Sequence, residues 1–427
     1  MPFSGNENEE VEYGRYYKPE VKNTIKLTLA FAKAVGKHQS DKADNLVISP
    51  YNALAALSMA AKGADGQTRD ELAKALYGAE GGDLDAAVEA YAKLNDEMLK
   101  ANKGQVDLTT ANGIWTNKDL VTLRDSYVQD MKDVLKAQIS AEDYGDPATV
   151  DKINQWASDN TNKLITEVIE QLDPNDAAIL ASALHFKGEW THKFDKKLTE
   201  DKVFTQDGAA QATTPTMHQD FKEEGGVSYQ KGKGFEAIAM TYGKEDFDEG
   251  KYPTMRIVLV RPTEENVSAR DFLDAQDSAK VPAWLDAYQY REAVGSVELP
   301  RMDIKQKHDL IPAMEDMGVK QAFSQGAADF TRMVEQGGDR LYISQVSHDT
   351  VFKTDEEGSE AAAVTTVRMT LESVRPDPVN IDMKLDRSFI FALQDVRTNA
   401  VIFMGVVNKP NEDMKPVAKT APKGPAL

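Results

Sequence analysis

The feature that most constrains this chain is a charge-free, β-prone run with acids on one side and turn formers on the other. Residues 355–371 read DEEGSEAAAVTTVRMTL and lead into ESVRPDPVN. The run AAAVTTV suits a buried strand, whereas the residues that follow are typical of an exposed loop. We therefore expect a segment that can occupy both kinds of position, and whose movement between them is the function.

Alternation along this run separates a charge-free face from a charged one. One face of an extended strand would carry uncharged residues throughout: Ser359, Ala361, Ala363, Thr365, Val367, Met369 and Leu371. The opposite face would carry every charge of the span: Glu360, Arg368 and Glu372. Gly358 precedes the run and offers a permissive backbone. Periodicity alone is equally compatible with an ordinary internal strand.

Composition excludes several classes of function. The 427-residue chain can bury a substantial core, and its formal net charge of −20 with no basic block argues against nucleic acid or heparin as a partner. No apolar stretch is long enough to predict a membrane-spanning helix. There is no Cys, so disulfides and thiolate chemistry are excluded.

Helical patterns come first along the chain and strand patterns later. Apolar spacing predicts helices at 21–38, 49–63, 68–78 (with Thr68 as its cap), 84–100, 123–135, 150–172, 268–276 and 309–318. β-branched or alternating runs predict strands at 106–117, 177–190, 236–242, 254–262, 295–304, 341–354, 379–393 and 400–407. This order predicts an α+β fold.

No linker or repeat divides the chain. We predict one domain over 19–410, preceded by a polar lead-in at 1–18 and followed by a disordered tail rich in Pro, Ala and Lys at 411–427. The start lacks the pattern of a signal peptide. The expected location is extracellular or at the cell surface, in a form without its signal peptide, and the cytoplasm remains open.

No catalytic or metal-binding motif is present. The six histidines are His38, His185, His192, His218, His308 and His348. None has the spacing of a zinc protease, and neither a GxSxG elbow nor a phosphate-binding loop occurs. We expect no catalytic residue, no metal and no cofactor.

Several segments together resemble the serpin family. DEEGSEAAAVTT resembles the hinge of the serpin reactive loop, and NLVISPYNALAALSMAAKG, ALHFKGEWTHKFD, SVELPRMDI and DRSFIFALQDVRTNAVIFMGVVNKP resemble other serpin segments in serpin order. The resemblance covers roughly residues 20–410. Within the family, the sequence resembles bacterial inhibitory members. It implies a single domain with a large central sheet, two smaller sheets, eight or nine helices and an exposed reactive-centre loop at about 356–380.

The resemblance also implies a mechanism. A serine protease would cleave the loop, become covalently attached to it, and be trapped when the loop inserts into the central sheet of the metastable inhibitor. A monomer that tends to form loop-sheet polymers is expected. The alternative is a non-inhibitory serpin that acts as a carrier or chaperone. Such proteins usually have bulky, charged or proline-bearing hinges, and the run AAAVTT of this hinge has no such residue.

The usual family count places the cleaved bond at Glu372–Ser373, which suggests a glutamate-tolerant or elastase-like protease. If the register shifts, Leu371 or Met369 would favour elastase, subtilisin or chymotrypsin types, and Arg368 would favour trypsin types. The hinge would comprise Glu356, Glu357, Gly358, Ser359, Glu360, Ala361, Ala362, Ala363, Val364 and Thr365. Control of sheet opening would fall on Ser49, Asn52, Ser182, His348 and Trp190, where Ser182 departs from the Asn usual in the family.

Overall fold

The computed structural model describes residues 19–79, 81–208, 210–222, 226–245, 252–278, 280–335, 341–358 and 377–417. Eight α-helices lie in these ranges: α1 (Pro19–Lys37), α2 (Pro50–Gly63), α3 (Gly66–Tyr77), α4 (Leu84–Asn102), α5 (Asp125–Asp133), α6 (Ala148–Asn160), α7 (Ala269–Asp274) and α8 (Ile311–Asp316). Short 3-10 helices include η2 (Lys196–Leu198) and η5 (Gln321–Phe323).

The described strands form three hydrogen-bonded sheets. They are β1 (Leu46–Ile48), β2 (Asp107–Asn117), β3 (Gln138–Glu142), β4 (Ala178–Lys187), β5 (Glu200–Thr205), β6 (Gln211–Phe221), β7 (Val227–Gly232), β8 (Phe235–Tyr242), β9 (Met255–Pro262), β10 (Arg291–Pro300), β11 (Met302–Asp309), β12 (Ser347–Thr354), β13 (Val379–Lys384), β14 (Phe389–Asp395), β15 (Val401–Val407) and β16 (Lys415–Pro416). The predicted α+β class is confirmed.

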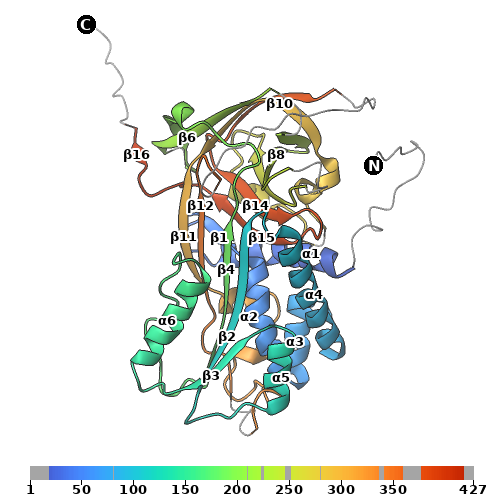
Figure 1. Ribbon diagram of the computed structural model, residues 1–427, viewed down its shortest axis with the longest axis vertical. Coiled ribbons are helices and arrows are strands. Elements are labelled where there is room, and N and C mark those ends of the chain that lie inside the picture. The colour runs from blue at the N-terminus through green and yellow to red at the C-terminus, as the bar shows by residue number, and fades with distance from the viewer. Residues whose placement is uncertain are drawn as a thin grey trace, which may run out of the picture.

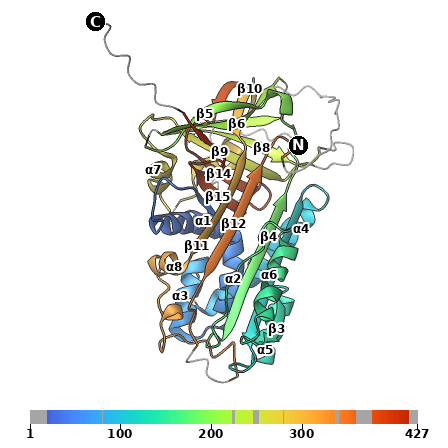
Figure 2. The same cartoon turned by 90° about the vertical axis from the view of Figure 1, so that its left-hand side faces the viewer.

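Two of these sheets form the long lower part of the molecule. One has the order β3-β2-β4 and the other is the antiparallel pair β11-β12. Figures 1 and 2 show β4 and β12 as neighbours that both run toward the upper end of the molecule. Within the described residues β4 pairs only with β2, and β12 pairs only with β11. The two facing edges therefore carry backbone groups without a strand partner in this part of the chain.

Helix α2 supports both of these strands from behind. Its sequence is almost continuously apolar, and nearly all of its residues are buried. Pro50 stands at its start, where a missing N–H is harmless, and the Ser49 hydroxyl caps the helix by accepting the N–H of Asn52 at 3.3 Å. This cap places Ser49 and Asn52 at the level of the sheet.

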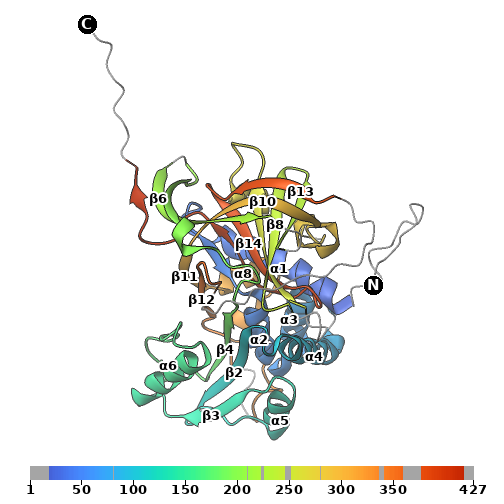
Figure 3. The same cartoon turned by 45° about the horizontal axis from the view of Figure 1, so that its top comes forward.

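The third sheet crosses the upper end of the molecule (Figure 3). It contains the fully buried strands β14 and β15, and its strand β10 pairs with β6 on one side and β13 on the other. The chain leaves this sheet after Pro300, turns at Arg301 and continues as β11 in the two-stranded lower sheet. Arg301 therefore marks a corner that joins the two parts.

The helix predicted over 150–172 ends early, so that prediction is wrong for its second half. Asn162 and Lys163 have φ values of 48° and 63°, which a right-handed helix cannot include. The Asn154 side chain then accepts the backbone N–H groups of residues 168 and 169 at 2.8 and 3.1 Å. The apolar residues that suggested a helix pack instead as an irregular segment on a small tryptophan-containing cluster.

Thr68 does not cap a helix, because α3 begins two residues earlier, at Gly66. The Thr68 hydroxyl instead accepts the N–H of Asp329 at 3.0 Å. Glu71, three residues further along α3, accepts two backbone N–H groups at the start of η5 at 2.7 and 2.8 Å. Tertiary contacts have therefore taken the polar groups that the local pattern assigned to a cap.

The predicted disordered tail does not begin at residue 411. Residues 415 and 416 pair with β6, and the N–H of Val417 donates to the carbonyl of Gln211 at 3.0 Å. The open edge of β6 supplies these partners, which composition alone could not reveal. Residues 418–427, like the lead-in at 1–18, lie outside the described residues.

Within the described ranges, no helix is both long enough and apolar enough to cross a bilayer. The same residues contain no group of three or more His, Asp or Glu side chains arranged to hold a metal ion.

Candidate functional site

The candidate site lies where β4 and β12 end, immediately before the charge-free run in the sequence. We call the four residues that follow β12 the loop anchor: Asp355, Glu356, Glu357 and Gly358. Two N–H groups that follow β4 bind it. Trp190 donates to the carbonyl of Glu357 at 3.1 Å, and Phe194 donates to that of Glu356 at 3.0 Å. The upper ends of the two strands are therefore joined through the loop anchor.

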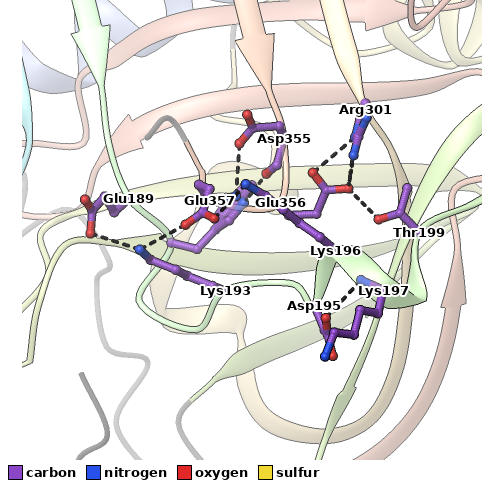
Figure 4. Close-up of polar contacts among 11 residues, drawn as sticks. Glu189, Lys193, Asp195, Lys196, Lys197, Thr199, Arg301, Asp355, Glu356 and Glu357 are labelled. Carbon is purple, nitrogen blue, oxygen red and sulfur yellow. Dashed lines mark hydrogen bonds and ion pairs between the residues drawn. The ribbon is translucent and has the colours of Figure 1, made fainter. Parts of the chain in front are cut away.

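The carboxylate of Glu356 is the most buried charge of the loop anchor, with 1% of its side chain exposed. The Nε and Nη2 groups of Arg301 donate to it at 2.9 and 2.6 Å, and the Thr199 hydroxyl donates as well (Figure 4). Burial would raise the pKa of Glu356, but the Arg301 guanidinium and the Thr199 hydroxyl hold it below its ordinary value. This charge-assisted contact ties the loop anchor to the corner between β10 and β11.

The Glu357 side chain points away from Arg301 and meets two lysines. Lys196 lies 2.9 Å from its carboxylate and Lys193 lies 3.2 Å away, and Lys193 also contacts Glu189 at 3.3 Å (Figure 4). Hydrogen bonds from Lys196 and Lys193 lower the pKa of Glu357. Because Lys196 is largely exposed, solvent screens these pairs, and they orient the loop anchor more than they stabilise the fold.

Trp190 closes the site from the side of β4. Its indole Nε1 donates to the carbonyl of Asp355 at 2.8 Å, and its ring stacks on Tyr242 with centroids 4.4 Å apart. The residue is 3% exposed. Trp190 therefore lies at the upper end of β4, and its position there is fixed by both packing and hydrogen bonding.

Gly358 is required by geometry. Its φ is +95°, and a Cβ at this position would lie 2.4 Å from the Trp190 nitrogen and 2.5 Å from the Gly188 carbonyl oxygen. Any side chain would collide with backbone and adopt a conformation that is strained for an L-residue. The chain therefore leaves the loop anchor through a position that only glycine fits.

A second group of predicted residues meets lower down, beneath the sheet. We call Ser49, Asn52, Ser182 and His348 the α2 cluster. Asn52 donates to the Ser182 carbonyl at 2.9 Å and accepts from the Ser182 hydroxyl at 2.6 Å. The N–H of Ser49 donates to His348 Nε2 at 2.9 Å. In these described residues β4 and β12 are thus each bonded to the start of α2.

Comparisons with known proteins identify the family of the chain. The sequence profile of one family, described as "Serpin (serine protease inhibitor)", matches residues 22–410. Iripin-2 of Ixodes ricinus is 31% identical over 376 residues, which cover 86% of this chain and 88% of that protein. The chain belongs to the serpin family.

Solved serpin structures show the same fold. The thermophilic serpin tengpin in its native state has a TM-score of 0.74 and 28% identity, covering 90% of this chain and 94% of its own. Human thyroxine-binding globulin, solved in complex with thyroxine, has a TM-score of 0.75 and 23% identity, with coverage of 92% and 99%. The predicted single-domain serpin fold with one large and two smaller sheets is confirmed.

The structure of this serpin places some of the predicted site residues and not others. It describes Glu356, Glu357 and Gly358 of the hinge, together with Trp190 and all four residues of the α2 cluster. The remaining hinge residues and the bond candidates lie outside the described residues: Ser359, Glu360, Ala361, Ala362, Ala363, Val364, Thr365, Arg368, Met369, Leu371, Glu372 and Ser373. Their roles, and the control of sheet opening by the other residues, stay predictions.

Sequence reasoning missed the cationic side of the site. Arg301, Thr199, Lys193 and Lys196 were not singled out, although they bind the acids of the loop anchor. The available signal was weak. A basic cluster, HKFDKK, follows the β4 segment, and a lone Arg interrupts the LPRMD strand segment.

His348 is buried and carries no charge at neutral pH. Burial, with a smaller contribution from nearby His308, lowers the pKa of His348 from 6.5 to about 3. The neutral ring can then use its Nε2 lone pair to accept the N–H of Ser49. A protonated ring would lose this bond and place a charge beneath the sheet.

We predict that Arg301→Ala destabilises the native protein by about 2–3 kcal/mol, because it leaves the Glu356 carboxylate buried without its cation. Glu356→Gln should cost only about 1 kcal/mol, since the amide can still accept hydrogen bonds. Urea unfolding measures both. Lys353→Ala is the matched control, because it removes an exposed ion pair with Asp303. Equal losses for Arg301→Ala and Lys353→Ala would contradict the assignment.

We also predict a pH dependence that His348 causes. Because the pKa of His348 is lower in the folded state, the unfolded state binds more protons between pH 6.5 and about 3. The stability that neutral His348 contributes is therefore complete above pH 6.5 and declines as the pH falls. Between pH 7.5 and 5.0 the native protein should lose about 2 kcal/mol more than the His348→Gln variant. Unfolding free energies at both pH values test this, and parallel pH profiles would refute it.

Proposed function

We propose that this serpin is a suicide-substrate inhibitor of serine endopeptidases. The supporting observation is that β4 and β12 end together at the loop anchor, while each pairs on one side only within the described residues. Both strands run upward (Figure 2), so a segment that folds back from Gly358 would be antiparallel to both. Such a segment could form hydrogen bonds with both open edges.

The bait is the bond Glu372–Ser373 in this proposal. The hydroxyl of the protease serine attacks the Glu372 carbonyl carbon, the C–N bond to Ser373 breaks, and the new amino group takes a proton from the protease's general acid. An ester then joins the protease to Glu372. Leu371, Met369 and Arg368 remain the alternative positions, with the protease classes that each would favour.

Insertion of the freed segment supplies the driving force. Residues 359–371 present an uncharged face that can be buried, and each strand hydrogen bond contributes about 0.5–1.5 kcal/mol in addition to the buried apolar area. Over a dozen residues the sum is on the order of 10 kcal/mol, comparable with the whole stability of a domain. Seventeen extended residues from 356 to 372 span about 55 Å, which is about the diameter of the domain.

A binding role is the second candidate. Thyroxine-binding globulin shares this fold and was solved with thyroxine, so the fold alone does not decide between inhibition and ligand binding. The small, uncharged residues at 361–367 favour inhibition, because nothing in them opposes burial between two strands. An extracellular or cell-surface location belongs to the same proposal.

The experiment mixes the protein with elastase, subtilisin, trypsin and a glutamyl endopeptidase. We expect an SDS-stable complex with at least one of them, and mass spectrometry of the released C-terminal peptide should show cleavage after Glu372. The cleaved protein should melt well above the intact one. Cleavage without a complex and without a rise in Tm would favour the binding role, and turnover of a substrate by the protein alone would favour an enzyme.

The matched control is Ala363→Pro. Proline lacks an N–H and is excluded from central strands, so the cleaved loop of this variant should insert poorly. It should be cut at the same bond and release active protease. An unchanged yield of complex would show that trapping does not depend on insertion.

A further inference from the structure

The C-terminal segment lies as a strap over the upper end of the molecule. We call residues 410–417 the C-terminal strap. Its residues 415 and 416 pair with residues 213 and 212 of β6, and the Lys415 ammonium lies 3.7 Å from the Asp201 carboxylate on β5. Figures 1 and 3 show β16 beside β6.

The C-terminal strap continues an edge that β10 leaves open. β10 pairs with β6 from residue 221 to residue 216 and then turns away after Pro300, while β5 occupies the opposite edge of β6. Residues 212 and 213 of β6 are next on that open edge, and β16 pairs with them. The strap therefore covers the part of the sheet edge beside the β10–β11 corner.

The strap also holds the corner itself. The Asn411 side chain donates to the Thr214 hydroxyl at 2.6 Å and to the Arg301 carbonyl at 3.4 Å. The Pro410 carbonyl accepts the N–H of Asp303 at 2.9 Å. On the other side, the N–H of Arg301 donates to the Pro215 carbonyl at 2.9 Å. The backbone of the corner is thus held between β6 and the strap.

The same corner carries the guanidinium that holds the loop anchor. The Arg301 side chain neutralises the buried Glu356 carboxylate, so the position of the Arg301 backbone sets the geometry of that ion pair. A shift of the corner would weaken the contact and leave a buried charge without its partner. The strap and the hinge are far apart in the sequence, but the contacts that connect them in space pass through one residue, Arg301.

We propose that the C-terminal strap regulates sheet opening by holding Arg301 on Glu356. It acts as a brake that slows the entry of a strand between β4 and β12. This inference rests on the proposed function, because a brake has meaning only if the sheet accepts a strand.

The test measures how fast a synthetic peptide with the sequence of residues 359–371 enters the sheet. Uptake is followed on native gels and by the rise in Tm of the product. Truncation after Lys409 removes the strap and should speed uptake about fivefold, as expected for the loss of two or three hydrogen bonds at a partly exposed corner. Truncation after Val417 retains every strap contact described above and is the matched control, with an unchanged rate.

A second set of variants separates regulation from loss of folding. Asn411→Ala keeps the full chain and should speed uptake by a smaller factor. Arg301→Ala should also speed uptake, and adding the Lys409 truncation to it should produce no further increase, because both act through one contact. Independent, multiplying effects would overturn the proposed path through Arg301.

The outcomes distinguish the two proposals. Equal uptake by the Lys409 and Val417 truncations would overturn the brake and leave the inhibitory mechanism standing. Absence of uptake by every variant and by the full-length protein, together with absence of a protease complex, would overturn the proposed function and the brake with it.

Discussion

The ion pair between Glu356 and Arg301 is the contact on which the upper part of the structure depends. A carboxylate that is 1% exposed needs a cation and hydrogen bonds, and Arg301 and Thr199 supply them. The pair joins the end of β12 to the corner where β10 becomes β11. The loop anchor, the sheet corner and the C-terminal strap therefore form one connected group.

Below the loop anchor, β4 and β12 are held by α2. β4 is bonded to α2 through Asn52 and Ser182, and β12 is bonded to α2 through Ser49 and His348. The two strands share a support beneath them and a fastening at their upper ends.

Most of the helices and strands could be predicted from the sequence, because an element that is buried on one face has apolar residues at a regular spacing. Through the serpin resemblance the sequence also singled out Trp190, Gly358 and the residues of the α2 cluster, whose roles stay predictions. It could not predict the Glu356–Arg301 pair, because two charges 55 residues apart have no local signature. The pairing of the tail with β6 was missed for the same reason, since it depends on a partner far away in the sequence. The early end of α6 was missed because the left-handed backbone at Asn162 and Lys163 leaves no mark on the apolar spacing.

The attachment of β13 has one more consequence. β13 pairs in parallel with β10 over six residues, so the segment that starts after Gly358 is tethered at its far end as well. The twenty residues from 359 to 378 reach about 66 Å when extended, which is too short to descend the full sheet and return. In the uncut chain both ends of this segment are therefore attached to strands, and hydrolysis of one bond within it frees one end. In the proposed mechanism, the length of this segment alone makes full insertion depend on cleavage.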